Sequence, residues 1–290
     1  MVGAAASAFA LFPSWVGGAR LPLQNLWHER TMPDDMPISL LPLSQYYALN
    51  IFVMLLLGGV IAGLIVRWRH LRAGMAALGV LAVQVIVAVQ SFAVVAAGHG
   101  LLDGTARSRE LLYFGGMLGG VIAGILLAQL GCWMASRRSV MLPSLAVALS
   151  AVPVGSWIGV LIVSFNPIYG YPPVVGMILR WVPAVIVAVA LIWAGVRPLG
   201  RLIVWVVGLL ALWMLPAVFT AINYGLGMRV LQGDLREMAV AATQVFPLAL
   251  AETTLPVVIA LGLAVVGTVV RMLVGKPGGD VGRVQRGEIS

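Results

Sequence analysis

The sequence predicts an all-α, polytopic integral membrane protein, folded as a helical bundle with about seven transmembrane helices. Two observations carry this prediction. Of the 290 residues, 61% are hydrophobic and only 10% are charged, whereas charged residues make up about a quarter of a typical soluble domain. Seven apolar segments also reach the roughly 20 residues that a helix needs to cross the hydrocarbon core of a bilayer: 45–66, 75–97, 112–135, 141–164, 177–196, 202–224 and 248–273.

The cationic residues are divided unequally between the two ends of this predicted bundle. Short basic loops stay in the cytoplasm, so we expect the N-terminus outside and the C-terminus inside the inner (plasma) membrane of a cell. The net charge of +8 is then a topology signal, and no soluble face remains that could gather it for nucleic-acid binding. Eleven of the 18 Lys and Arg residues fall on the predicted inner side: Arg67, Arg69, Arg72, Arg137, Arg138, Arg197, Arg201, Arg271, Lys276, Arg283 and Arg286.

We expect three parts along the chain: an N-terminal segment on the outer face (1–44), a transmembrane helical domain (45–275) and a cytoplasmic tail (276–290). Residues 1–19 are apolar and rich in Ala, Gly and Ser, and they lack the basic start of a secretory signal peptide. This stretch either lies on the outer face as a short interfacial helix or ends an eighth transmembrane helix that begins before Met1. We expect the first of these two arrangements.

Residues 20–44 contain four prolines and predict an extended loop. Asp34 and Asp35 are adjacent there, and carboxylate oxygens are the ligands that Mg²⁺ or Ca²⁺ accepts. The two acids could therefore bind a divalent cation, although adjacent acids on a solvated loop more often contact water alone. No cofactor is predicted.

The first and third predicted helices contain the same glycine-rich hexapeptide, at 58–63 and 119–124. The repeat records either duplication of a helical hairpin or convergence within a biased alphabet. Small residues let two membrane helices approach closely. Gly58, Gly59 and Gly63 therefore predict a packing face on the first helix.

The third predicted helix carries a longer glycine ladder. Gly116, Gly120 and Gly124 recur at every fourth residue, which places them on one face of the helix. This face predicts contact with a neighbouring helix, with a membrane-protein partner or with a second copy of the chain. The lipid bilayer is the other expected partner.

Five prolines interrupt four successive predicted helices in their middle or outer parts: Pro153, Pro183, Pro216, Pro247 and Pro256. Proline inside a membrane helix is tolerated where neighbouring helices, hydroxyl groups or water satisfy the freed carbonyls. The five positions together predict a cavity that opens outward.

Glu252 is the only acidic residue inside any of the membrane-length segments. A carboxylate in hydrocarbon costs roughly 2.5 kcal/mol or more, so it normally faces water or the bundle interior and marks a functional site. Arg180 is predicted at a comparable depth, where it could be the counter-ion that a buried carboxylate needs. We predict a substrate site formed by Glu252, Gln244, Asn223 and Arg180.

Three hypotheses for function follow. The first is a transporter or permease for a small or amphipathic solute, with an outward-facing cavity near Glu252. The second is a noncatalytic membrane subunit of a larger complex, such as an export permease component, docked through the glycine ladder. The third is an outer-face enzyme acting on a lipid-linked substrate, with Asp34 and Asp35 at its centre and Arg107 and Arg109 holding a diphosphate. The familiar catalytic motifs are missing from the sequence, so no catalytic residue is predicted and the transporter is favoured.

Overall fold

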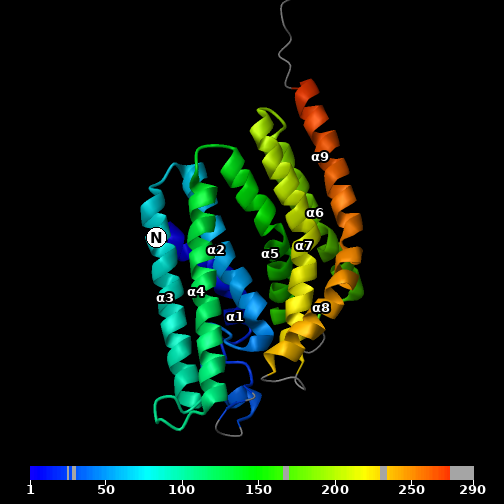
Figure 1. Cartoon of the computed structure of the whole chain (residues 1–290). Coiled ribbons are helices and arrows are strands. Elements are labelled where there is room, and N and C mark those ends of the chain that lie inside the picture. The colour runs from blue at the N-terminus through cyan, green and yellow to red at the C-terminus, as the bar shows by residue number, and fades with distance from the viewer. Residues whose placement is uncertain (25, 28–30, 166–169, 229–233, 275–290) are drawn as a thin grey trace, which may run out of the picture.

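Figure 1 shows the computed structural model of the chain, which describes all residues except 25, 28–30, 166–169, 229–233 and 275–290. The predicted cytoplasmic tail, 276–290, thus lies outside the described residues. Seven described segments are long and apolar enough to cross a membrane, which confirms the all-α, multi-pass membrane bundle. Its helices are α1 (Val2–Val16), α2 (Ala48–Arg69), α3 (Ala73–Gly98), α4 (Ser108–Ser136), α5 (Met141–Phe165), α6 (Pro173–Ala194), α7 (Leu202–Gly227), α8 (Leu235–Glu252) and α9 (Thr254–Val274).

The helices pack around two apolar cores that α5 connects. α2 contacts α1, α3, α4 and α5, and the first core fills the space between these helices and the segment that joins α1 to α2. The second core lies between α5, α6, α7 and α9 and consists largely of alanine, valine and leucine. α8 lies along α7 at the edge of this second group. The interface between the two groups is where the candidate site lies.

One end of the bundle, at the top of Figure 1, gathers the arginines of the short connections, and we call it the basic end. Several of these side chains satisfy carbonyls at helix C-termini. Arg67 donates to the carbonyls of Arg137 and Ser139 after α4, and Arg271 donates at 2.6 Å to the carbonyl of Ile192 near the end of α6. A cation stabilises the negative end of a helix dipole, so these charges also have a structural role.

α1 lies inside the bundle, against α2, α3 and α5. Its first turn is so close to the first turn of α3 that a Cβ added at Gly3 would overlap the backbone of Ala76. At the other end of α1, Gly17 lies near Ser164, which belongs to the last turn of α5. α1 therefore runs in the same direction as α3 and α5, through most of the depth of the bundle.

This position differs from the interfacial helix that we expected for residues 1–19. The reason is the small size of the side chains on α1, which permits close backbone packing. A Cβ at Gly58 of α2 would lie only 3.1 Å from Ser7, and the Trp157 indole donates a 2.8 Å hydrogen bond to the Ala10 carbonyl. The alanine and glycine content is thus a helix-packing signal, as in other membrane helices.

The glycines of α2 also pack against α4. A Cβ at Gly59 would overlap the backbone of Ala128, and one at Gly63 would crowd Cys132. The two helices can lie this close only because glycine has no side chain there. The predicted packing face on this helix therefore lies at a helix contact.

The glycine ladder of α4 is only partly used within the chain. Gly124 faces Leu55 of α2, whose methyl group would lie 3.0 Å from an added Cβ. At Gly116 and Gly120 no other atom of the described chain lies within 4 Å of that position. Two of the three predicted contact positions thus face open space.

The segment from residue 17 to 47, which we call the cap, folds over the end of the bundle opposite the basic end. Arg20 and Ile38 pair in an isolated antiparallel bridge, and the Leu41 N–H donates to the Ser91 hydroxyl of α3 at 2.8 Å. Leu41 is completely buried. The predicted extended loop is therefore a packed element in its described part, because its leucines are inserted between the helix ends.

The last predicted helix, 248–273, is two helices in the structure. α8 begins at Leu235, where the Asp234 side chain caps it by accepting from the N–H groups of Arg236 and Glu237 at 3.1 Å each. α8 ends at Glu252 and α9 begins at Thr254, so the whole apolar span covers 39 residues. The predicted helix corresponds to α9 and the last turn of α8, and Thr253 is the junction.

Candidate functional site

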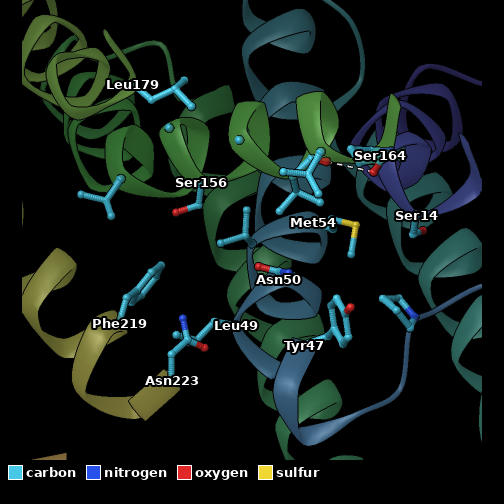
Figure 2. A pocket seen from close by; sticks show the side chains of 18 of the residues that line it. Ser14, Tyr47, Leu49, Asn50, Met54, Ser156, Ser164, Leu179, Phe219 and Asn223 are labelled. Atoms are coloured by element: carbon cyan, nitrogen blue, oxygen red, sulfur yellow. Dashed lines mark hydrogen bonds between the residues drawn. The ribbon is translucent and has the colours of Figure 1, made fainter. Parts of the chain in front are cut away.

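A cavity of about 1440 Å³ lies in the half of the bundle away from the basic end. Its wall combines both groups of helices: the ends of α1, α5 and α7, the starts of α2 and α6, the cap, and the junction between α8 and α9. Figure 2 shows side chains from several of these elements around the same space. The volume exceeds the roughly 300–1,000 Å³ that is usual for small-molecule sites.

Unpartnered polar side chains face this cavity. Asn50 of α2, Ser156 of α5 and Asn223 of α7 approach it from three sides (Figure 2). Within the described part of the chain, none of these three side chains has a hydrogen-bond partner. Their amide and hydroxyl groups can therefore both donate to and accept from a bound molecule. Met54 and Phe219 supply apolar surface between them.

Three further hydroxyl groups on the wall are acceptors. Ser14, Ser164 and Thr220 each donate a hydrogen bond of 2.9 Å to a carbonyl of their own helix. A hydroxyl has one proton and two lone pairs, so each of these oxygens presents acceptor capacity once its proton is used. The polar part of the wall thus suits a solute that carries hydrogen-bond donors.

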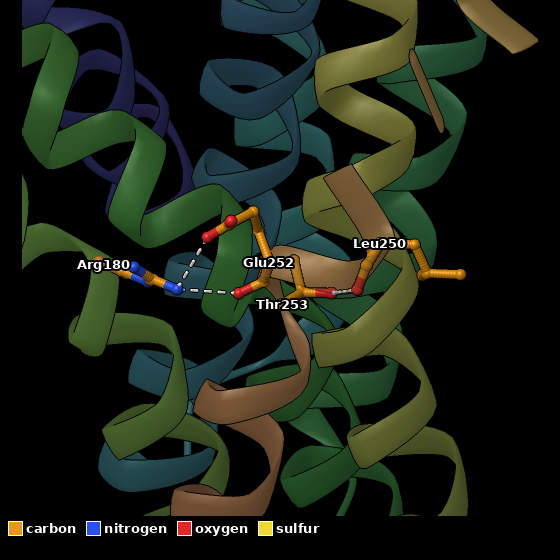
Figure 3. A network of polar contacts seen from close by, with 4 residues as sticks. All are labelled: Arg180, Leu250, Glu252 and Thr253. Atoms are coloured by element: carbon orange, nitrogen blue, oxygen red, sulfur yellow. Dashed lines mark hydrogen bonds and ion pairs between the residues drawn. The ribbon is translucent and has the colours of Figure 1, made fainter. Parts of the chain in front are cut away.

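An ion pair joins α6 to the junction on this wall. Arg180 Nη2 lies 3.2 Å from Glu252 Oε2 and also donates to the Glu252 carbonyl at 2.9 Å (Figure 3). That carbonyl ends α8, so the arginine neutralises the carboxylate and also caps the negative end of the helix. The two side chains are 46% and 77% exposed, which makes both accessible from the cavity. The counter-ion relation predicted from sequence is therefore present.

The junction itself is held by Thr253. Its hydroxyl lies 2.8 Å from the Leu250 carbonyl of α8 and 2.8 Å from the Trp213 carbonyl of α7. Its one proton is therefore shared between an acceptor in its own helix and an acceptor in α7. Pro256 lies in the first turn of α9, where its missing N–H leaves no intrahelical bond unmade.

The prolines mark the cavity in part. Pro183, Pro216 and Pro256 lie on its wall, in three different helices. Pro153 and Pro247 interrupt α5 and α8 but are not on the wall. A cavity at the proline-interrupted part of the bundle was predicted, although not every proline belongs to it.

The remaining predicted residues are only partly brought together. Asp34 lies on the cavity wall with Arg20, whereas Asp35 does not. Gln244 is exposed on α8, away from the cavity. Arg109 lies beside a different hollow. The carboxylate and the arginine that an outer-face enzyme would combine are therefore in separate places, and the described residues hold no group of three metal-ligating side chains.

Sequence reasoning missed Asn50 and Ser156 as cavity residues, as well as Tyr47 at the start of α2. Asn50 is the only side-chain amide within α2, and that isolation is the signal that could have found it. Ser156 follows Gly155 in a helix with many small residues, so nothing local distinguishes it from a packing serine. Only the approach of α2, α5 and α7 makes these positions a site.

No protein-family model, curated protein or solved structure matches this chain. Among the described residues, two cations and two anions lie on the wall, Arg20 and Arg180 with Asp34 and Glu252, so their formal charges cancel. Amides, hydroxyls and apolar side chains complete the wall, and such a mixture can bind a polar or amphipathic molecule without net charge.

Proposed function

We propose that this chain is an integral membrane transporter or permease for a small or amphipathic solute, which binds in the cavity beside Glu252. One observation carries the proposal: an accessible ion pair lies at the junction between α8 and α9, on the wall of a large cavity. Several transporter folds bind their substrates where membrane helices are discontinuous, because free backbone groups and helix dipoles meet there.

The balance of charge on the wall favours a solute that is neutral or zwitterionic. A zwitterion could exchange its carboxylate and ammonium groups with the partners of the Arg180–Glu252 pair. Asn50 and Asn223 would then bind its uncharged polar groups, and Phe219 its apolar part. Each of these interactions uses a side chain that already faces the cavity.

The same ion pair can couple binding to movement. α6 packs on α5, α7 and α9, whereas α8 packs on α7, so Arg180 and Glu252 provide a polar link between α6 and the end of α8. A solute that competes for either partner would weaken this link. Binding would thereby favour another position of α8, which is how a ligand shifts a conformational equilibrium.

The test begins with native mass spectrometry of the protein, extracted gently from the membrane that contains it. The small molecule that leaves with the protein is identified and then supplied to proteoliposomes for flux measurements. We expect Glu252→Gln to reduce flux roughly tenfold or more, because hydrogen bonds to charged groups contribute about 1.5–3 kcal/mol. The control is Glu237→Gln, the same change in the exposed first turn of α8, which should retain the wild-type flux.

Unchanged flux in Glu252→Gln would remove the main support for the proposal. Equal losses in the two variants would also contradict it, since the effect would then not depend on the cavity. A protein that releases no small molecule but retains a second protein in stoichiometric amount would favour a different function.

That second candidate is a noncatalytic subunit of a membrane complex. It is favoured by the glycine ladder of α4, because at Gly116 and Gly120 no other described atom lies within 4 Å of an added Cβ. Exposed glycines on a membrane helix allow another helix to pack closely. The identity of the retained protein would then be the best guide to function.

A further inference from the structure

A second hollow lies on the other side of the first turn of α2. It has a volume of about 660 Å³ and is bordered by α4, the start of α2, the cap, and single residues from α7 and α8. We call it the α4 groove and define it by Ile51 and Phe52 of α2 and by Arg109, Tyr113, Gly116 and Gly120 of α4. Its lining is mainly apolar, with the polar groups near the start of α4.

The length of the α4 groove matches one leaflet of a bilayer. It follows α4 from Arg109 to Ala123, and the rise between these two residues is about 21 Å at 1.5 Å per residue. Half of a hydrocarbon core is about 15 Å thick. The groove therefore spans the depth of one acyl chain together with the level of its headgroup.

Gly116 and Gly120 form the floor of the groove on the α4 side. No other described atom lies within 4 Å of a Cβ built at either position, so the packing of the protein does not require glycine there. Glycine weakens a helix relative to alanine. The absent side chains leave room for something that is not part of this chain.

The rim of the groove is cationic. Arg109 is exposed in the first turn of α4 and has no ion-pair partner among the described residues. The neighbouring Glu110 directs its carboxylate to the N–H of Arg107 at 3.0 Å. A phosphate at this level would therefore meet an available guanidinium group, which binds phosphate oxygens well.

We propose that the α4 groove binds an anionic phospholipid, with one acyl chain over Gly116 and Gly120 and its phosphate at Arg109. The site is separate from the proposed solute cavity, although both share Leu23 and Leu49 in their walls. It does not depend on transport activity.

The full chain, purified in detergent, is titrated with phosphatidylglycerol and with phosphatidylcholine of the same acyl chains, and bound lipid is counted by native mass spectrometry. We expect one phosphatidylglycerol to bind more tightly than phosphatidylcholine. Arg109→Gln should reduce this preference about fivefold, the effect of one arginine near an anionic surface. Gly116→Leu and Gly120→Leu should abolish binding of both lipids by filling the groove.

Gly115→Leu and Gly119→Leu are the matched controls. These positions lie on the same helix and also have no other described atom within 4 Å, but they do not line the groove. Both variants should bind lipid as the wild type does. Equal affinity for the two lipids, equal loss in groove and control variants, or a second copy of the chain displaced by Gly116→Leu would each overturn the proposal.

Discussion

Gly59 and Gly120 occupy the same position in the repeated hexapeptide, but their surroundings are opposite. Gly59 lies against the backbone of Ala128 in α4, while Gly120 faces open space. The sequence contains no difference between the two copies that would reveal this. The distinction arises because α2 is surrounded by four helices and α4 lies at the edge of the bundle.

This contrast predicts opposite results for one substitution. Gly59→Ala should lower the stability of the purified protein by about 1–3 kcal/mol, the usual cost of overpacking. Gly120→Ala should leave it unchanged or raise it by up to about 1 kcal/mol, since alanine favours helix. The thermal unfolding midpoint in detergent checks both, and equal midpoints for the two variants would contradict the α2–α4 contact.

Two polar side chains of α3 show where sequence reasoning stops. Gln84 donates a hydrogen bond of 2.8 Å to the Leu55 carbonyl of α2, and Ser91 accepts one of 2.8 Å from the Leu41 N–H of the cap. The first is the helix-to-helix bond that polar residues in membrane helices commonly make. The bond of Ser91 joins the helix to the cap instead. It depends on how residues 38–41 fold, and local sequence does not determine that fold.

Among the elements, the junction between α8 and α9 is the one most closely tied to the proposed function. Prolines on either side of Glu252 predicted a weakened helix, and the structure has its break at Thr253. The start of α8 is also within reach of sequence reasoning, because Asp234 is a favoured N-cap residue and Glu237 suits the first turn of a helix.

The Thr253 hydroxyl predicts a further outcome at this scale. Thr253→Val retains the shape of the side chain but removes its hydrogen bonds to Trp213 and Leu250. We expect a loss of stability of about 0.6–1.7 kcal/mol, typical of such bonds in membranes, together with a lower solute flux in proteoliposomes.

The control is Thr243→Val, which removes a single bond from the hydroxyl to the Val240 carbonyl within α8. This variant should retain the wild-type flux. If it lost as much flux as Thr253→Val, the contact between the junction and α7 would not be the cause.

For the whole molecule, hydropathy and charge were sufficient to predict the fold class and seven segments long and apolar enough to cross a membrane. Hydropathy and charge could not predict which helices are neighbours, because an apolar helix face can contact lipid or protein equally well. Contacts between helices distant in sequence determine three features: the position of α1 inside the bundle, the fold of the cap, and the approach of Asn50, Ser156 and Asn223 to one cavity. The Arg180–Glu252 pair could be predicted from the sequence because a carboxylate at that depth needs a partner.

The orientation of the molecule is a testable prediction of the positive-inside rule. Ser139→Cys lies in the connection between α4 and α5 at the basic end, and Asp103→Cys lies in the connection between α3 and α4 at the other end. Both positions are exposed, whereas the native Cys132 is buried and should not react. A membrane-impermeant thiol reagent applied to intact cells should label the variant at residue 103 and leave the one at residue 139 unlabelled. The reverse pattern would place the basic end outside.

The buried position of α1 also has a consequence for the order of assembly during synthesis. The Ala10 carbonyl receives its hydrogen bond from Trp157, which is 147 residues further along the chain. At a ribosomal rate of about 5–20 residues per second, the first helix waits roughly 7–30 s before this partner emerges. During that interval α1 can pack only against α2 and α3, which emerge earlier, and the later contact with α5 then encloses it.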